Sequence, residues 1–499
     1  MKQLITFILL AICFPFLPIQ AQAPADAITK TQVKSDLYFL ASDFLKGRRT
    51  GSIGNDIAAE YIATQIQAAG FKPAPGMENY FQTINFETII PPSEGALKLN
   101  NTEYQLGEDL LLITGAAADY KKATAVFAGH GLEADYQGLD VKGKVVFVQG
   151  GRPDDNSRQA TFEAMTSKKQ LAEKMGAVGL IEIYNMNRPW SYFQRYFGRK
   201  SMNLPNDESD GSGDKIIYGW IQANREVDDL KQMQDGKKLT VQLSSSGFKK
   251  EVNPSHNVVG ILEGSDPELK NEYILLSAHF DHVGVGKQGG GTITETDSIF
   301  NGARDNGAGT VALLSAARAL GQNPPKRSVL YLACTAEEIG LLGSRYFAEH
   351  PVVPLNQIVF NLNIDNGGYN DTSIITVVGF GRTGTDDLIR TASERYGLKT
   401  INDPSPGQGL FDRSDNVSFA RKGIPALTFS LGFTDFDAEI MKYYHQVTDN
   451  PDNMDYDYLH KYVQSYARLA RLVADDAKRP QWIKGDKYEE AGKALYNKQ

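Results

Sequence analysis

The second half of the chain carries imidazole and carboxylate side chains at positions where they could act together on a metal ion. The candidate residues are His279, Asp281, Asp305, Glu337, Glu338, Asp365 and His445. Neutral imidazole and carboxylate groups are good zinc ligands, and a catalytic zinc keeps one coordination position open. One carboxylate can also bridge two ions about 3.5–4 Å apart. Two histidines and three acids would therefore suffice for two zinc ions that activate a water molecule.

Asp305 is the strongest candidate for a bridging ligand. It lies in the segment 304–309, with the sequence RDNGAG, directly before a predicted helix. The glycines in this segment permit the tight backbone that is needed to place a carboxylate between two ions. An aspartate before a helix can also act as an N-cap, which is the structural alternative for this residue.

Apolar strands alternate with helices after residue 253, and this order predicts an α/β domain. The predicted strands are 258–262, 273–278, 329–334, 358–364 and 426–431, and the predicted helices are 310–320, 344–349, 385–396 and 456–477. Near-continuous apolar strands indicate a mixed, mostly parallel sheet between helix layers. Ligands bind beyond the carboxyl ends of the strands in such sheets. Three predicted strands should therefore direct His279, Glu338 and Asp365 to one edge.

The chain is too long for one hydrophobic core, because single cores stop growing at roughly 250–300 residues. Residues 24–88, which begin with helical patterns, and residues 253–480 are predicted to form the α/β domain. Residues 89–252 contain short β-rich runs between glycine and aspartate turns, which predict an inserted domain. Residues 481–499 are predicted to be a polar tail.

Residues 1–23 have the order of a secretory signal: Lys2, an apolar run over 4–17, and the sequence AQA at 21–23. The run is shorter than the roughly 20 residues that cross a bilayer, and no later stretch predicts a transmembrane segment. We therefore expect an exported protein, either periplasmic or secreted. Cys13 offers a lipoprotein anchor as the lesser alternative, against which the bulky Ile12 argues.

The charge of the chain limits its partners. A formal net charge of -8, from 52 basic and 60 acidic residues, argues against nucleic acid, which would require a basic surface. A peptide or a small molecule is the expected partner, and the oligomeric state is unknown from the sequence. After removal of the signal, Cys334 is the one remaining cysteine, so no intrachain disulfide is expected.

Six ordered segments resemble those of the M28 family of zinc peptidases. They are 277–284 (SAHFDHVG), 305–309 (DNGAG), 335–340 (TAEEIG), 363–365 (NID), 414–416 (SDN) with 423–426 (GIPA), and 444–445 (YH). Segments 138–146 and 176–179 of the insert resemble a protease-associated domain. The resemblance implies a zinc-exopeptidase fold and two zinc ions per chain.

The resemblance also implies a role for each candidate residue. His279 and Asp365 would bind one zinc, Glu338 and His445 the other, and Asp305 both. Glu337 would be the general base, Asp281 would orient His279, and the Asp305–Asn306 peptide would be cis. Asn366 and Asn416 depart from the family's usual residues, and both are expected beside the substrate.

These features predict an aminopeptidase that removes single residues from peptide ends. A carboxypeptidase or dipeptidase on the same metals is the main alternative, because Arg413 could bind a free carboxylate. Glutaminyl cyclase chemistry uses one zinc, and the presence of both His279 and Asp305 argues against it. A binding protein without activity is the remaining alternative, against which the complete set of ligands and base argues.

The other histidines of the chain are expected to be structural or exposed. They are His130, His256, His282, His350 and His460. The tyrosines next to His445 are expected to be packing residues, and Cys334, within a predicted strand, is expected in the core.

Overall fold

A computed structural model describes residues 24–155, 158–185, 189–205, 215–222 and 228–497. The predicted signal at 1–23, including Cys13, lies outside the described residues. Within the described ranges, no helix combines the length and the apolar character that crossing a membrane requires.

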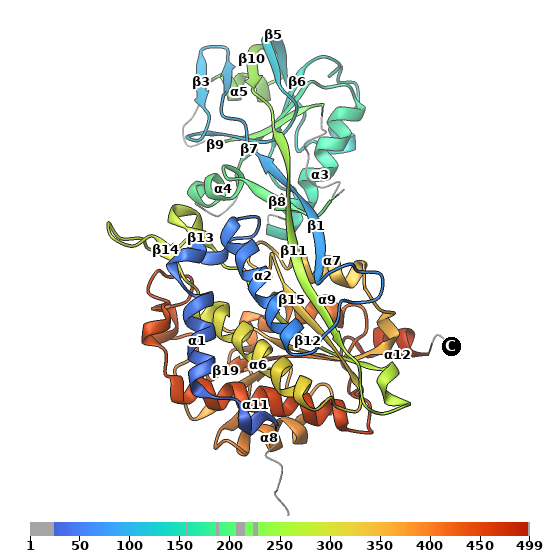
Figure 1. Ribbon diagram of the computed structural model, residues 1–499. Helices are drawn as coiled ribbons and strands as arrows, with labels where there is room; N and C mark the ends of the chain where they lie inside the picture. Colours follow the sequence, from blue (N-terminus) through green and yellow to red (C-terminus); the bar gives the residue numbers. More distant parts are fainter. Residues whose placement is uncertain (1–23, 156–157, 186–188, 206–214, 223–227, 498–499) are drawn as a thin grey trace, which may run out of the picture.

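The larger of two main sheets has nine strands in the order β18-β17-β19-β16-β12-β15-β11-β1-β8 (Figure 1). Their bounds are β1 Phe81–Ile90, β8 Ser201–Asn203, β11 Lys249–Leu262, β12 Tyr273–His279, β15 Ser328–Cys334, β16 Ile358–Ile364, β17 Ile374–Val378, β18 Lys399–Asn402 and β19 Ala426–Leu431. The four central strands β15, β12, β16 and β19 are parallel, and antiparallel pairs flank them. The sheet is mixed, as the sequence predicts.

Helices cover both faces of this sheet (Figure 1). The helices are α1 Lys30–Leu40, α2 Ile53–Ala68, α6 Gly309–Gln322, α7 Leu342–Glu349, α8 Asp386–Glu394, α9 Asn416–Ala420, α10 Ala438–Met441, α11 Tyr456–Asp475 and α12 Glu489–Tyr496. Alternate residues of β12 belong to different apolar clusters: Ile274 and Leu276 pack with α6 and α11, whereas Leu275 packs with α7 and α9. Because strand side chains alternate between faces, the central strands are buried on both.

The N-terminal segment Pro24–Ala27 and the following turn lie against α11. The Nε2 atom of Gln464 donates to the carbonyl oxygen of Ala25 at 3.3 Å, and Nε2 of His460 lies 2.7 Å from the carbonyl oxygen of Ile28. The segment that precedes α1 is thus held against the last long helix of the domain.

The segment 481–499, predicted to be a polar tail, is folded onto the α/β domain as far as it is described. The Trp482 indole is buried and donates to the carbonyl oxygen of Gly423 at 3.0 Å. The hydroxyl of Tyr496, on α12, donates to the carbonyl oxygen of Ile358. Two aromatic residues therefore dock a segment whose other side chains are mostly polar, and the expectation of a tail is wrong.

The second main sheet has eight strands in the order β3-β2-β10-β5-β6-β7-β9-β4. Its elements are β2 Gly95–Leu99, β3 Thr102–Gln105, β4 Leu110–Thr114, β5 Ala118–Phe127, β6 Val145–Gln149, β7 Gly179–Tyr184, β9 Ile217–Gln222, β10 Leu239–Ser245, and helices α3 Arg158–Lys174, α4 Trp190–Phe197 and α5 Asp228–Gln234. Its two apolar clusters consist of residues from this stretch of the chain. It forms the upper body in Figure 1.

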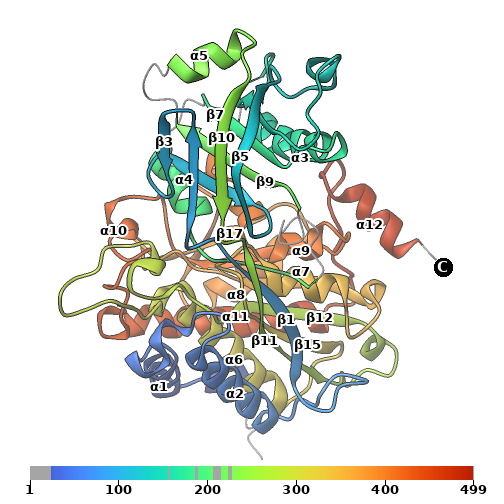
Figure 2. The ribbon, with the colours of Figure 1, turned by 90° about the horizontal axis from the view of Figure 1, so that it is seen from above.

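The long strands β1 and β11 join the two bodies, and they run side by side in both views (Figure 2). Their antiparallel register extends from Phe81 opposite Val258 to Ile90 opposite Lys249. The short strand β8, which comes from the middle of the insert, returns to pair with β1 at the edge of the larger sheet.

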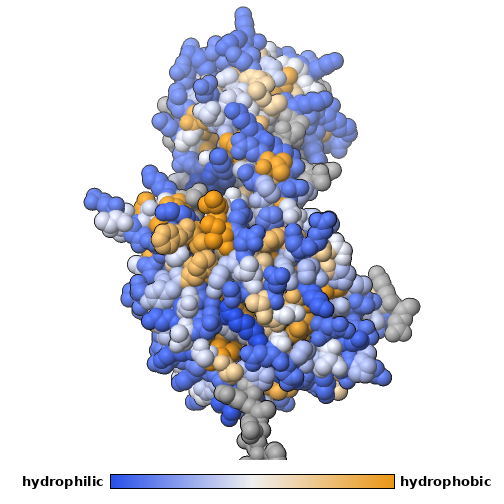
Figure 3. Space-filling model, viewed as in Figure 1, coloured by the Kyte–Doolittle hydropathy of each residue, from blue (hydrophilic) through white to orange (hydrophobic). Residues whose placement is uncertain are grey.

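The visible face of the molecule is largely hydrophilic (Figure 3). An apolar patch lies where α2 begins. Phe44, Ile53 and Ile57 are exposed there.

Candidate metal centre

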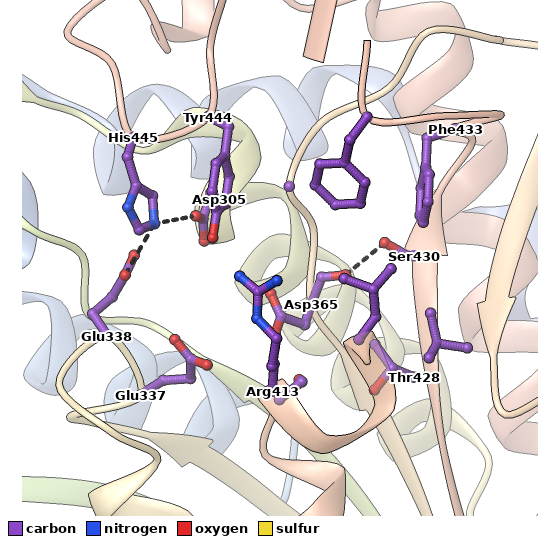
Figure 4. Close-up of a pocket in the computed structure, with 15 residues that line it drawn as sticks. Asp305, Glu337, Glu338, Asp365, Arg413, Thr428, Ser430, Phe433, Tyr444 and His445 are labelled. Atoms are coloured by element: carbon purple, nitrogen blue, oxygen red, sulfur yellow. Dashed lines mark hydrogen bonds and ion pairs between the residues drawn. The ribbon is translucent and has the colours of Figure 1, made fainter. Parts of the chain in front are cut away.

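The candidate ligands come from several elements and meet at the carboxyl ends of the central parallel strands. His279 is the last residue of β12, and Asp365 directly follows β16. Glu338 lies four residues beyond β15, Asp305 lies just before α6, and His445 lies between α10 and α11. All but His279 line one pocket, into which their side chains point (Figure 4).

The two histidines each face two carboxylates. Nε2 of His279 lies 3.3 Å from Oδ1 of Asp365 and 3.5 Å from Oδ1 of Asp305. Nε2 of His445 lies 3.1 Å from Oδ2 of Asp305 and 3.1 Å from Oε2 of Glu338. Asp305 thus presents a different oxygen to each imidazole. This donor set, with one shared carboxylate between two nitrogen–oxygen groups, fits two zinc ions.

The turn that carries Asp305 is tied to the neighbouring strand ends. The Asp305–Asn306 peptide is cis, as the family resemblance implies. The Asn306 side-chain amide donates to the carbonyl oxygens of Ile364 at 3.0 Å and His279 at 3.3 Å. A Cβ atom at Gly309 would lie 2.1 Å from Oδ1 of Asn306, so this position excludes larger residues. The turn and the ends of β12 and β16 therefore form one unit.

Asp281 contacts more than the histidine that it was expected to orient. Nδ1 of His279 lies 3.2 Å from the carbonyl oxygen of Asp281 and 3.8 Å from its carboxylate. The carbonyl oxygen is therefore the closer group. The carboxylate accepts hydrogen bonds from the backbone N–H groups of Glu337 at 3.1 Å and Glu338 at 3.4 Å, and from the Thr50 hydroxyl at 3.1 Å. Burial and the nearby Glu338 raise the pKa of Asp281 to about 6. Its carboxylate thus holds the turn that carries both glutamates.

The adjacent glutamates have opposite electrostatic surroundings. Burial raises the pKa of Glu337 well above its usual value, and the charges of Asp365 and Glu338 raise it further, although His279 opposes them. Burial acts in the same direction on Glu338, but contacts with His445 and His282 outweigh it and hold its pKa well below the usual value. Glu337 is therefore suited to hold a proton, and Glu338 is suited to remain a carboxylate.

Three residues near the ligands were not predicted to belong to the site. Nδ1 of His282, expected to be structural, lies 2.7 Å from Oε1 of Glu338. The Tyr444 ring stacks on the His445 ring, with centroids 4.2 Å apart, and also lines the pocket. The carboxylate of Asp449 accepts from the backbone N–H of Asp305 at 3.3 Å. His282 and Asp449 contact residues that are far away in the sequence, so spacing along the chain could not predict their place at the site. Tyr444 is the exception, because it is the neighbour of His445.

Asn366 and Asn416 do not line the pocket, and the expectation that they lie beside the substrate is wrong. Both are completely buried. The Asn366 amide bonds to Asn306 at 2.9 Å, and the Asn416 amide donates to the carbonyl oxygen of Phe411 at 3.1 Å. The two amide side chains form hydrogen bonds with buried polar groups behind the pocket wall, so their role here is structural.

The pocket extends from the acidic cluster to an apolar end. In Figure 4, Phe433, Ser430 and Thr428 lie on the opposite side from Glu338 and His445. The apolar side chains that line the pocket are Val378, Leu410, Phe433 and Phe436. The Ser430 hydroxyl donates to the carbonyl oxygen of Asp365 at 2.6 Å, which joins the two ends. Arg413 lies between them.

Comparisons with known proteins indicate a peptidase. Residues 257–470 match the model of peptidase family M28. Aminopeptidase YwaD of Bacillus subtilis is 24% identical over 507 aligned positions, which cover 97% of each chain. The probable leucine aminopeptidase 2 of Aspergillus oryzae is 28% identical over 59% of this chain and 52% of that protein. The solved structure of an aminopeptidase from Aneurinibacillus sp. strain AM-1 shares the fold, with a TM-score of 0.58 and 21% identity over 92% of this chain and 99% of that one.

The mixed sheet and the paired imidazole–carboxylate groups at its edge define a metallopeptidase. The match to peptidase family M28 covers residues 257–470, the part of the chain that carries these groups.

Proposed function

We propose that the chain is a two-zinc aminopeptidase that removes single residues from the amino ends of peptides. The observation that carries the proposal is Asp305, whose two carboxylate oxygens face His279 and His445 separately. His279 and Asp365 would hold one ion, Glu338 and His445 the other, and Asp305 both. The relatives reported above are named as aminopeptidases, which supports aminopeptidase activity for this chain.

Zinc at this centre would supply a bound water of lowered pKa and would polarise the scissile carbonyl group. Glu337 is the group that would take and return the proton. It lines the pocket without a close ligand contact, since its Oε2 atom lies 3.9 Å from Nε2 of His279. Its raised pKa allows it to hold the proton until the leaving amine accepts it, which is general acid–base catalysis.

The two ends of the pocket suggest how a peptide would lie. The end that carries Asp305, Glu337, Glu338 and Asp365 would receive the first peptide bond, because the proposed zinc ions and base lie there. The apolar end would receive the side chain of the first residue. We therefore expect a preference for apolar amino-terminal residues, such as leucine, over acidic ones.

A carboxypeptidase or dipeptidase remains the second candidate, because Arg413 lines the pocket and could pair with a substrate carboxylate. Three substrates separate the candidates: a leucyl anilide, an N-blocked peptide with a free carboxyl end, and a dipeptide beside its carboxamide. Cleavage of the anilide alone supports an aminopeptidase. Cleavage of the blocked peptide would replace the proposal with a carboxypeptidase, and a strict need for the dipeptide carboxylate would make it a dipeptidase.

Metal analysis tests the two-ion proposal directly. The purified active protein should contain two zinc ions per chain, and a strong chelator should abolish hydrolysis of the anilide until zinc is restored. Full activity at one ion per chain would overturn the bridging role of Asp305.

We further propose that residues 1–23 direct export and are removed, and that residues 89–252 form a protease-associated domain. The N-terminal sequence of the protein recovered from outside the cytoplasm tests the first proposal. A start within the apolar run 4–17 would contradict it.

A further inference from the structure

His282 is a buried histidine beside the proposed ligands that does not itself line the pocket. Its side chain is completely buried, and its Nδ1 atom lies 2.7 Å from Oε1 of Glu338. Since a carboxylate oxygen can only accept, Nδ1 carries the proton in this contact. Its Nε2 atom has no hydrogen-bond partner among the described residues. Among the described residues, the imidazole therefore makes one side-chain hydrogen bond, to Glu338.

This bond divides the two oxygens of Glu338 between different partners. Oε1 faces His282, whereas Oε2 lies 3.1 Å from Nε2 of His445 on the side of Asp305. A carboxylate with one oxygen held by a hydrogen bond presents the other oxygen to a metal in a fixed direction. Without that bond, the carboxylate could rotate or offer both oxygens.

The backbone around His282 prevents its ring from moving away. A Cβ atom at Gly302 would lie 2.6 Å from the Cγ and Cδ2 atoms of the ring, so the glycine backbone packs directly on it. Gly302 has a φ of +57°, a conformation that glycine adopts without strain. The backbone N–H of His282 donates to the carbonyl oxygen of Arg48 at 3.3 Å. The ring is thus fixed between a turn and the glutamate.

We propose that His282 is a positioning residue that holds Glu338 as a one-oxygen ligand and so strengthens one zinc site selectively. The inference rests on the proposed two-zinc function. Groups that support a metal ligand in this way typically contribute about 10–100-fold to metal affinity. The effect is expected at the ion that Glu338 and His445 share and not at the ion of His279 and Asp365.

A matched pair of variants separates the hydrogen bond from the packing. His282→Asn places an amide N–H near the position of Nδ1, whereas His282→Leu has a similar branched shape and no donor. Zinc is titrated into the metal-free proteins in competition with a chromophoric chelator, and two dissociation constants are fitted. We expect His282→Leu to weaken one site by about 10–100-fold, the other site to stay unchanged, and His282→Asn to recover most of the loss. His256→Leu, on β11, serves as the control for removing a histidine, and the thermal midpoint of each metal-free protein checks folding.

Unchanged zinc affinity at both sites in His282→Leu would overturn the inference. An equal loss of zinc affinity in the asparagine and leucine variants would also overturn it, because the loss would then come from packing and not from the hydrogen bond. The proposed function fails differently. If the wild-type protein binds fewer than two ions, the two-zinc proposal is wrong and this inference falls with it.

Discussion

Glu337 and Glu338 are neighbours in the chain with different surroundings, and a pair of substitutions distinguishes their roles. Glu337→Gln keeps the size of the side chain but removes the base, so zinc should remain while kcat falls about 10²–10⁴-fold, equivalent to about 3–5 kcal/mol at the barrier. KM should change little, because the interaction belongs to the chemical step. Zinc content and kcat, measured together on a leucyl anilide, provide the check.

Glu338→Gln is the matched control, because a neutral amide is a poorer zinc ligand and this variant should lose metal. If Glu337→Gln loses metal while Glu338→Gln keeps both ions, the two roles are reversed. Near-full turnover of Glu337→Gln would place the base elsewhere.

Zinc binding should release protons from the two ligand histidines. Burial alone would lower the pKa of His445, but Glu338 and Asp305 outweigh it and raise the value to about 11. Burial also opposes the charge of His279, but Glu337, Asp365 and Asp305 outweigh it and raise the pKa of His279 well above its usual range. Both rings are therefore protonated near neutral pH in the metal-free protein, and ligands must be deprotonated to bind.

About two protons should leave these rings on metal binding at pH 7, and zinc affinity should fall steadily as the pH is lowered. Calorimetric titration in buffers of different ionisation enthalpy counts the protons. An enthalpy independent of the buffer would contradict this assignment.

The clustering of the proposed ligands could be predicted from the sequence because each of them lies within a few residues of a strand or helix end. The contact between His282 and Glu338 could not. It depends on the parallel pairing of β12 with β15, in which His279 is level with Cys334. That pairing brings residues 56 positions apart together, and spacing along one chain does not reveal which strands are neighbours.

At the scale of elements, the turn of Asp305 is joined to the segment of His445 by a buried ion pair. The Arg304 guanidinium lies 2.9 Å from the Asp449 carboxylate, with side-chain exposures of 3% and 1%. It also lies over the Tyr443 ring, 3.6 Å from the centroid. One pair thus connects the loops that carry two of the proposed ligands.

Arg304→Met should lower the free energy of unfolding by about 3–5 kcal/mol, because it leaves the Asp449 charge buried without its partner. Denaturant unfolding of the metal-free protein measures the loss. Arg390→Met is the control, since its pair with Asp387 is exposed at 48% and 99% and should contribute at most about 1 kcal/mol. Similar losses of unfolding free energy in both variants would show that the buried ion pair contributes no more to stability than the exposed one.

Among the elements, the strands 358–364 and 426–431 match the sequence prediction, because most of their residues are apolar and each run ends at a residue that breaks the apolar pattern, Asp365 or Gly432. Strands β17 and β18 were missed. β18 is a polar edge strand of four residues without a buried face, so it has no hydrophobic signal. Its partner β17 is a buried, largely apolar run of five residues, so the sequence does carry a signal for it, but its antiparallel pairing with β19 cannot be read from periodicity.

At the scale of the whole molecule, the insert can be removed at a defined place. Ile90 lies directly opposite Lys249, so residues 91–248 can be replaced by Asn-Gly, which favours a tight hairpin between β1 and β11. None of the proposed ligands lies in the excised part, so two zinc ions should remain bound. The activity ratio between a long peptide and a leucyl anilide should change if the insert controls access.

The excised protein should be less stable, because Met202 and Leu204 of the insert pack in one cluster with Ala336 and Leu342 beside the glutamate turn. Zinc analysis and thermal unfolding test both expectations. A folded protein without zinc would show that the insert helps to build the metal centre.

The contact of the N-terminal segment with α11 constrains the order in which the protein can fold. Ala25 bonds to Gln464, 439 positions later, and a ribosome adding about 5–20 residues per second needs roughly 20–90 s to make that stretch. The second sheet, a continuous segment, is complete long before. The middle of the chain can therefore fold first, while the segment around Ala25 waits unpaired until the last long helix has been made.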